Sequence, residues 1–433
     1  MHFQNEPSGA TLNMGAIEKW DWELGDRQIP FESWQDQFNW VEEPAASPDG
    51  EHVAAIVNID EGEFSVCVDG KAWETVFDKI WYLRYSPDGR LTALVSEMGE
   101  WTVAVDGSAW ENQFGYVWDT RFSADGKHIA VAAQQDMVYA IARDDVVWTN
   151  TFSMLTDPVL SLDGAHAAAV VQVQDFGSAD IQKFQAGNFS VAVDGNPWET
   201  LFVNAWGPVI SPDAGHVAVQ VRHTLYDYTI AVDSKRWDQS FSCVWNPAFH
   251  PHNGKVVAPV RIAGKWTMVQ DGEQLWERAF IQAWQQRFSA DGKHLAAVVS
   301  PKYGQWTMAV DGVAWASTFG DMIPDWTFSP DGTRVAAVFK AGEHWSLAVD
   351  GRRWRNDFAM AFNPVFSPDG NHVALRVELQ DGSHTIAVDD QIWSHACQHA
   401  WDPVFSPDGE KVLIRCVEDG VYHRRVLAVR DLL

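Results

Sequence analysis

The sequence predicts an all-β chain in which one four-stranded unit is repeated about ten times and closed into a ring. Two observations lead to this prediction. A turn of the type Ser-Pro-Asp-Gly recurs at a spacing of about 38 residues, and a Val-Asp-Gly-x-x-Trp-x-x-x-Phe element lies between successive turns. A fixed period of this length indicates one supersecondary unit repeated along the chain.

The ten turns are spaced evenly except between the fourth and fifth copies, and the sixth copy is degenerate (His-Pro-His-Asn-Gly). They begin at Ser47, Ser86, Ser123, Ser161, Ser211, His250, Ser289, Ser329, Ser367 and Ser406. Pro and Asp at the centre suit a type I turn, and Gly supplies the left-handed residue that follows it in a bulged hairpin.

One unit, Trp284 to Phe319, shows the expected strands most clearly. Short runs rich in Val, Phe, Thr and Trp alternate with Asp-Gly turns, which is typical of hairpins. No segment has the length or the period of a helix. Small twisted sheets of this kind close best as a β-propeller, because radial packing leaves few exposed strand edges.

The two ends of the chain predict how the ring closes. The first part of the repeat region, with Trp34 and Phe38, supplies a strand in excess, whereas the last unit ends at 426–429 without a Trp-Phe element. We therefore expect the terminal strands to share one blade. Residues 1–28 are predicted to form an N-terminal extension and 29–433 the propeller. Two five-bladed rings are the alternative, although no linker separates two halves.

Residues 172–188 break the repeat inside one unit. This stretch is predicted to be a blade insertion that projects on one face, and its Phe176 and Phe184 are the candidate residues for contact with a partner.

The chain has 24 Trp residues, which sort into classes by repeat position. Ten occupy the Asp-Gly-x-x-Trp position: Trp34, Trp73, Trp110, Trp148, Trp198, Trp237, Trp276, Trp315, Trp354 and Trp393. Because they recur once per unit, we expect them to be structural wedges between blades. A platform for stacking sugars, or a series of rings for electron tunnelling, would instead require several exposed rings on one face.

Histidine also recurs, close after the turn, at His52, His128, His166, His216, His294 and His372. One His per blade is too widely spaced for ligands that must lie about 2 Å from one metal ion, so we expect these side chains to cap polar groups. His395, Cys397 and His399 form the only local His/Cys cluster, but their spacing does not converge on a strand. No metal-binding, cofactor-binding or catalytic residue is predicted, and no common nucleophile, phosphate-loop or metalloprotease motif occurs.

The composition favours an acidic protein of the cytoplasm. The formal net charge of −28 disfavours nucleic acid and anionic lipid as partners and leaves a basic partner open. No secretory signal or membrane-spanning stretch is recognisable. The four Cys residues are far apart in the sequence and are expected to be reduced.

The Ser-Pro-Asp-Gly-x-x-Val-Ala unit resembles the repeat of TolB-type propellers, relatives of the Trp-Asp (WD) repeat proteins, over nearly the whole chain. More narrowly, the Ala-Val-Asp-Gly-x-x-Trp repeat and the Trp content resemble the tryptophan-rich cytoplasmic subunit of the transmembrane redox complex of sulfate-reducing bacteria. That resemblance implies a cofactor-free accessory subunit that is peripheral at the inner face of the membrane through its partner subunits.

Three functions are therefore open. The chain is expected to be a non-catalytic protein–protein interaction propeller, an accessory subunit of a membrane-associated electron-transfer complex. The alternatives are a propeller that binds carbohydrate or another small ligand through exposed Trp, and an enzyme with its site at the propeller centre.

Overall fold

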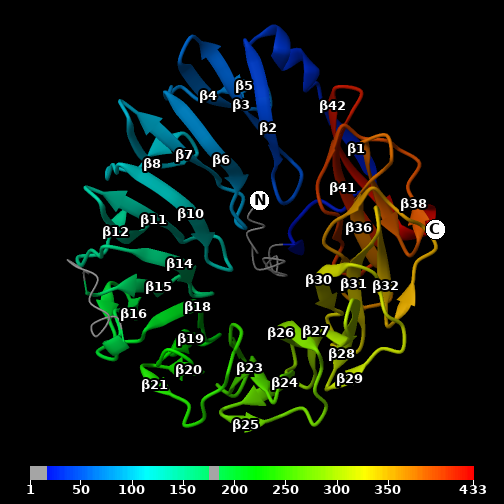
Figure 1. Cartoon of the computed structure of the whole chain (residues 1–433). Coiled ribbons are helices and arrows are strands. Elements are labelled where there is room, and N and C mark those ends of the chain that lie inside the picture. The colour runs from blue at the N-terminus through cyan, green and yellow to red at the C-terminus, as the bar shows by residue number, and fades with distance from the viewer. Residues whose placement is uncertain (1–16, 175–184) are drawn as a thin grey trace.

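The chain forms a single ring of ten blades, a ten-bladed β-propeller with four-stranded blades (Figure 1). The computed structural model describes residues 17–174 and 185–433. All strand pairings are antiparallel within one blade; the strands of blades 1 to 9 follow one another in chain order, whereas blade 10 combines strands from both ends of the chain. The predicted ten-fold repeat is confirmed.

Blades 1 to 5 each run from the inner to the outer strand in sequence order. The strands are β2 (Trp40–Ala46), β3 (Val53–Asp60), β4 (Glu63–Val68) and β5 (Lys71–Ala72); β6 (Lys79–Tyr85), β7 (Leu91–Glu97), β8 (Glu100–Val105) and β9 (Ser108–Ala109); β10 (Tyr116–Phe122), β11 (Ile129–Gln135), β12 (Val138–Arg143) and β13 (Val146–Val147); β14 (Leu155–Leu160), β15 (Ala167–Gln172), β16 (Phe189–Val193) and β17 (Asn196–Pro197); and β18 (Asn204–Ile210), β19 (Val217–Arg222), β20 (Tyr228–Val232) and β21 (Lys235–Arg236).

Blades 6 to 10 follow the same plan, except that the inner strand of blades 9 and 10 is split in two. The strands are β22 (Ala248–Phe249), β23 (Val256–Ile262), β24 (Lys265–Gln270) and β25 (Glu273–Gln274); β26 (Gln282–Phe288), β27 (Leu295–Lys302), β28 (Gln305–Val310) and β29 (Val313–Ala314); β30 (Met322–Phe328), β31 (Val335–Ala341), β32 (His344–Val349) and β33 (Arg352–Arg353); β34 (Met360–Ala361), β35 (Val365–Phe366), β36 (Val373–Glu378), β37 (His384–Val388) and β38 (Gln391–Ile392); and β39 (His399–Ala400), β40 (Val404–Phe405), β41 (Lys411–Glu418), β42 (Val421–Ala428) and β1 (Gly25–Ile29).

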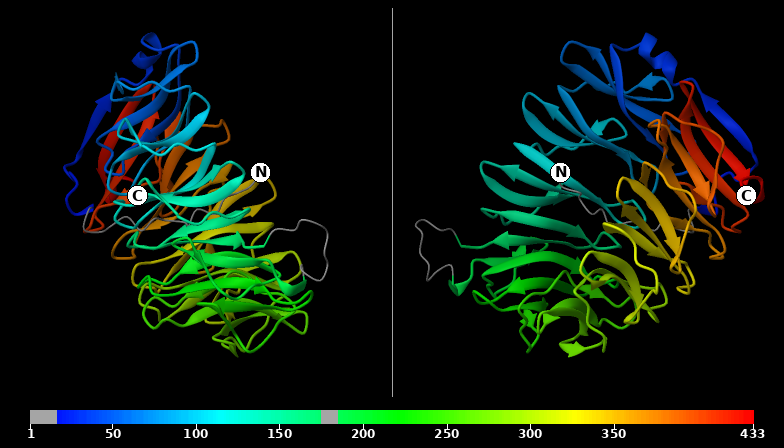
Figure 2. Two further views of the ribbon diagram at one scale, coloured as in Figure 1. Left: turned by 90° about the vertical axis from the view of Figure 1, so that its left-hand side faces the viewer. Right: turned by 45° about the vertical axis from the view of Figure 1, so that its right-hand side comes forward.

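Blade 10 closes the ring with strands from both ends of the chain. Strand β1 pairs antiparallel with β42, from Gly25 opposite Val426 to Ile29 opposite Tyr422, and Figure 2 shows the blue and red strands side by side in both views. The predicted closure by N- and C-terminal strands is confirmed. After β1, a short 3-10 helix (Glu32–Asp36) brings Trp34 to the boundary with blade 1, and a second one (Val429–Asp431) follows β42.

The hydrophobic core is divided among ten clusters, each drawn from two neighbouring blades. In the cluster that joins blades 10 and 1, Val417 and Tyr422 pack with Trp34 and Val53. Another cluster joins blades 5 and 6 through Ile230, Phe241 and Val256. The ring therefore closes once, and the alternative of two five-bladed rings is wrong.

The segment before β1 also packs on blade 10, where Ile17, Trp20 and Trp22 cover Leu413 and Val426. The insertion connects β15 to β16 in blade 4. Its candidate contact residues, Phe176 and Phe184, lie outside the described residues. Over the described ranges, none of the helices has the length and apolar character needed to cross a membrane.

Candidate functional site

The ring has two faces, because equivalent strand ends of all ten blades lie on the same side. The turn face carries the turns between first and second strands, such as the one beginning at Ser47. The hairpin face carries the hairpins between second and third strands, such as the one at Met98 between β7 and β8. The start of the inner strand also lies at the hairpin face, since Lys79 pairs with Ser96 and Ser96 with Trp101.

On the turn face, a Ser-Asp-His arrangement fixes the hairpin in six of the ten blades. In blade 1 the Ser47 hydroxyl donates to Asp49 Oδ1 at 2.6 Å. Asp69, in the next turn, accepts the backbone N–H of Val53 at 3.0 Å and lies 2.6 Å from His52 Nδ1. All six recurring histidines contact an aspartate in this way: His52, His128, His166, His216, His294 and His372. The prediction that they cap polar groups is confirmed.

These contacts shift the pKa values of two of the histidines and of several turn aspartates. The hydrogen bond to Asp69 raises the pKa of His52, and the bond to Asp233 does the same for His216. The Ser161 hydroxyl lowers the pKa of Asp163 by bonding to its ionised form. Because each group is bonded within its own hairpin, this network holds the blade together.

The ten Trp residues of the Asp-Gly-x-x-Trp position all lie between blades, one in each inter-blade cluster, and each is buried or partly buried. Several pack against the Asp-Gly turn of the following blade. A Cβ added to Gly107 would lie 3.1 Å from Trp73 Cγ, and one added to Gly195 would lie 3.1 Å from Trp148 Cβ. The glycine thus provides both the positive φ of the turn and the space for the indole.

A second set of aromatic residues lies at the hairpin face and forms a continuous row across blades 2 and 3. Trp81 packs on Trp101 with ring centroids 4.4 Å apart, Trp101 on Tyr116 at 5.8 Å, and Tyr116 on Trp118 at 5.9 Å. Tyr139 continues the row at 5.9 Å from Trp118. Trp81 and Tyr116 are each 41% exposed, so the row has its edge in solvent.

The hairpin face of blades 1 to 3 is also strongly acidic. Its exposed apolar side chains are Trp40, Trp81, Met98, Tyr116 and Met137, with Met98 90% and Met137 77% exposed. Its exposed acidic residues are Glu42, Asp60, Glu61, Glu63, Asp78, Glu97, Glu100 and Asp136. We call these thirteen residues the acidic aromatic sector. Lys79, whose Nζ lies 6.0 Å from the Trp81 ring, stands among them.

Across the ring, the same face carries basic residues beside the exposed acidic residues Asp227, Asp321 and Glu343. The hairpins and neighbouring strand ends of blades 5 to 8 carry Arg222, Arg261, Lys265, Lys302 and Lys340. Trp245 in blade 6 has the repeat position and the 41% exposure of Trp81, and it stacks on Trp266 at 5.4 Å. The two sectors therefore share their aromatic construction and differ in charge.

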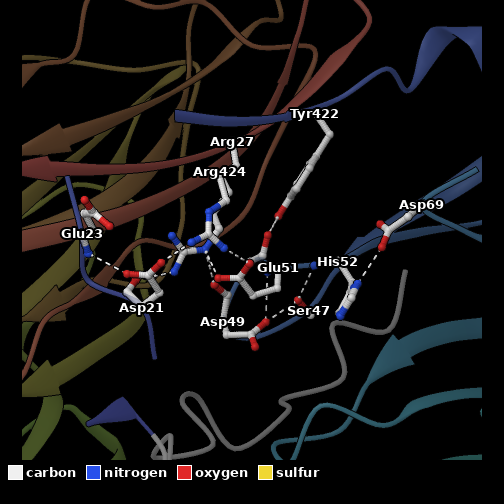
Figure 3. A network of polar contacts seen from close by, with 11 residues as sticks. Asp21, Glu23, Arg27, Ser47, Asp49, Glu51, His52, Asp69, Tyr422 and Arg424 are labelled. Carbon is white, nitrogen blue, oxygen red and sulfur yellow. Dashed lines mark hydrogen bonds and ion pairs between the residues drawn. The ribbon is translucent and has the colours of Figure 1, made fainter. Parts of the chain in front are cut away.

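The ring closure holds a network of polar contacts that joins both ends of the chain (Figure 3). Arg424 in β42 is 3% exposed; its Nε donates to the carbonyl of Asp49 at 2.9 Å and lies 3.0 Å from Glu51 Oε1. Arg27 in β1 pairs with Glu51 and with Asp21. This network latches the N-terminal segment and β42 to the first turn of blade 1, so its charges serve the closure.

The His/Cys cluster of the last units does not converge. His395 Nδ1 lies 2.8 Å from Glu418 Oε1. Cys397 is buried, and its backbone forms an isolated antiparallel bridge with His384 at the start of β37. His399 is on the inner strand β39, where burial lowers its pKa. In the part of the chain that the structure describes, no group of three or more His, Cys, Asp or Glu side chains is placed to hold a metal ion.

Comparisons with known proteins do not indicate a function. No protein-family model and no curated protein matches the chain. Similar solved structures include a eukaryotic initiation factor (11% identity, 75% of this chain and 90% of that one, TM-score 0.46) and the Dos1 propeller (10% identity, 89% and 92%, TM-score 0.37).

A third similar structure is TolB from Acinetobacter baumannii, at 17% identity over 63% of this chain and 62% of that one, with a TM-score of 0.31. All three TM-scores are below 0.5, so the assignment of a β-propeller rests on the ten sheets of this chain. None of these proteins is a tryptophan-rich redox-complex subunit, and that narrower resemblance has no support from the comparisons.

Proposed function

We propose that the protein is a non-catalytic interaction propeller that docks a basic partner protein on the acidic aromatic sector. The observation that carries this proposal is the combination of five exposed apolar side chains with eight exposed carboxylates on adjacent strand ends and hairpins of one face. Trp, Tyr and Met are enriched at the centre of protein interfaces, whereas large exposed apolar patches are uncommon on monomers.

The chemistry of the sector favours lysine and arginine side chains as its ligands. The ring faces of Trp81 and Tyr116 attract cations, with a free energy of about 0.5–1 kcal/mol at exposed sites. The surrounding carboxylates increase the rate of encounter with a positive surface and disfavour acidic partners. The negative charge of the sector also disfavours nucleic acid as a partner, because both surfaces would be negative.

The finer part of the proposal is that this partner belongs to a membrane-associated electron-transfer complex, with this chain as a cytoplasmic accessory subunit held at the inner face of the membrane. Its support is the resemblance of the Trp-rich repeat described above. The aromatic row alone is equally suited to any basic docking partner.

A second candidate function is carbohydrate binding on the same rings. The observation that favours it is the row in which the buried Trp101 lies between Trp81 and Tyr116, each of which is 41% exposed. In that case glycans would change the Trp fluorescence, and neutral glycans would bind independently of salt. A flat fluorescence response across a broad glycan panel would remove this candidate.

The docking proposal is tested by purification from the native cells at native expression level, followed by cross-linking with a reagent that joins carboxylates to lysines and by mass spectrometry. We expect a stoichiometric partner whose lysines are linked to Glu97, Glu100 or Asp136. Trp81→Ala should weaken the complex at least tenfold, whereas the matched variant Trp245→Ala should leave it intact. A protein that always elutes alone, or links confined to the turn face, would contradict the proposal.

A further inference from the structure

Two adjacent blades depart from the repeat at the same position of their second strand. Three residues after the first buried residue of that strand, eight blades have an uncharged side chain: Ile56, Leu94, Ala132, Val170, Gln220, Pro259, Val298 and Val338. Blades 9 and 10 have Arg376 and Arg415 instead. Since most residues of this chain follow the repeat for structural reasons, a charged exception on two neighbouring blades calls for its own explanation.

Arg415 is enclosed without a carboxylate partner. It is 8% exposed, and its guanidinium donates to backbone carbonyls only: Nη1 to Ser47 at 2.8 Å and to Pro48 at 3.2 Å, and Nη2 to Asp402 at 2.8 Å. Its buried Nε has no hydrogen-bond partner among the described residues. A buried charge that is not neutralised is costly, and that cost falls if an anion is bound nearby.

Arg376 brings a second guanidinium to the same place and does not cancel the charge. Its Nε lies 3.2 Å from Asp402 Oδ1, and its guanidinium carbon lies 3.5 Å from the centre of the Phe362 ring. Among the described residues, Asp402 supplies the only carboxylate that pairs with either guanidinium group, and it pairs with Arg376 alone. The cluster keeps a net positive charge in a protein whose formal net charge is −28.

A pocket of about 420 Å³ opens beside this cluster, at the junction of blades 9, 10 and 1. Arg376, Arg415, Asp402, His399, Trp401 and Pro44 line it. Its volume is within the range of small-molecule sites, about 300–1,000 Å³. Trp401 and Pro44 supply an apolar wall, and Arg376 and Arg415 supply the charge that would orient a ligand.

We propose that this pocket binds a small organic oxyanion, with its carboxylate or phosphate group on Arg376 and Arg415 and its apolar part on Trp401. Guanidinium groups suit planar oxyanions because their donors form a fixed fork. The site lies apart from the acidic aromatic sector of blades 1 to 3, so the inference stands independently of the proposed docking function.

The test is thermal unfolding and saturation-transfer NMR of the full chain with four probes: benzoate, phenyl phosphate, inorganic phosphate and the neutral isostere benzamide. We expect benzoate or phenyl phosphate to raise the unfolding midpoint saturably and to show transfer to their ring protons. Benzamide should do neither. Stronger binding of benzoate would identify a carboxylate site, and stronger binding of the two phosphates a phosphate site.

Arg376→Gln is the diagnostic variant, because Arg415 also holds the ring closure and its loss is expected to unfold the blade junction. Arg376→Gln should weaken binding at least tenfold. Arg334→Gln, which removes an arginine bonded to the carbonyls of Gly370 and Asn371 on the turn face, is the control and should bind as the unmodified chain does. Unchanged binding in Arg376→Gln, equal binding of benzamide, or no response to any probe overturns the proposal.

Discussion

The Tyr422 hydroxyl donates a hydrogen bond of 2.8 Å to the carbonyl oxygen of Gly50, which lies 372 residues earlier in the chain. Tyr422 is 1% exposed, and burial raises the pKa of its hydroxyl. The bond joins the last full strand, β42, to the first turn of blade 1. It therefore joins the first and the last blade of the propeller, and the pairing of β1 with β42 joins the two ends of the chain within the last blade.

Tyr422→Phe should destabilise the whole ring by about 1–3 kcal/mol, because it leaves the Gly50 carbonyl without its buried donor. Urea unfolding followed by circular dichroism measures the effect. Tyr139→Phe is the matched control, since Tyr139 packs on Trp118 and no hydrogen bond from its hydroxyl is seen in the described residues. Equal stabilities of the two variants would contradict a specific role of the closure bond.

The contact between Trp73 and Gly107 predicts that two glycines with similar backbone angles tolerate alanine differently. Gly107 has a φ of +84°, and an added Cβ would lie 3.1 Å from Trp73 Cγ; Gly99 has a φ of +85° but nothing within 4 Å of an added Cβ. Both Gly→Ala variants incur backbone strain of about 1–2 kcal/mol, and Gly107→Ala must also displace the indole. We expect Gly107→Ala to be clearly less stable than Gly99→Ala in urea unfolding. Similar losses would show that the indole yields freely.

The repeat could be predicted from the sequence because each turn has its own local chemistry. In each complete turn the glycine N–H returns to the serine carbonyl, as Gly370 does to Ser367 at 2.8 Å, and four residue types report that geometry directly. Strand β1 was less visible. As an outermost strand it is mostly exposed, with only Ile29 partly buried, so its sequence Gly-Asp-Arg-Gln-Ile carries no alternation of apolar and polar residues, and the described ring begins at Gly25.

The candidate sites were harder to predict, because exposure depends on which face a strand end reaches. Trp81 and Trp101 touch each other, yet Trp81 is 41% and Trp101 7% exposed. Sequence reasoning missed the acidic aromatic sector, since Trp40, Met98 and Met137 do not belong to the Trp repeat. Arg376 and Arg415 could have been found, because arginine replaces an uncharged residue at a fixed repeat position.

Acid should unfold the propeller steeply, because the same turn aspartate is repeated around the ring. Serine hydroxyls lower the pKa values of Asp163, Asp213, Asp331, Asp369 and Asp408 below the usual 3.8. A carboxylate whose pKa is lower in the folded than in the unfolded state stabilises the fold at any pH above its unfolded pKa. That stabilisation is lost as the pH falls through its folded pKa. The free energy of unfolding should therefore drop below about pH 4.

The serine variants test this origin. Ser367→Ala removes the donor that lies 2.5 Å from Asp369 Oδ1, so the difference in unfolding free energy from the unmodified chain should shrink as the pH falls below 3.8. Ser234→Ala, whose hydroxyl bonds Thr200, should show a constant difference. A constant difference for both would contradict the role of the turn carboxylates.

His52 and His216, whose pKa values are raised, act in the opposite direction. The pKa of His52 is raised by its hydrogen bond to Asp69, so its contribution is complete below the unfolded value of 6.5 and is lost as the pH rises through the folded value. His52 is more than half exposed, so solvent screening keeps the effect small. His52→Gln should reduce the change in the free energy of unfolding between pH 6 and pH 8. The control is His252→Gln, which removes a histidine without such an aspartate contact and should leave that change as it is in the unmodified chain.

The acidic aromatic sector predicts how salt controls docking. In a gel-shift or fluorescence assay with a lysine-rich peptide as the probe, the combined variant Glu97→Gln and Glu100→Gln should weaken binding several-fold at low salt and reduce its salt dependence, since exposed charges are screened beyond about 10 Å at 0.1 M salt. The control is the combined variant Asp238→Asn and Glu277→Gln, which removes two exposed acidic residues of blades 5 and 6 and changes the net charge by the same amount. If both pairs weaken binding equally, the overall negative charge of the protein and not this sector attracts the peptide.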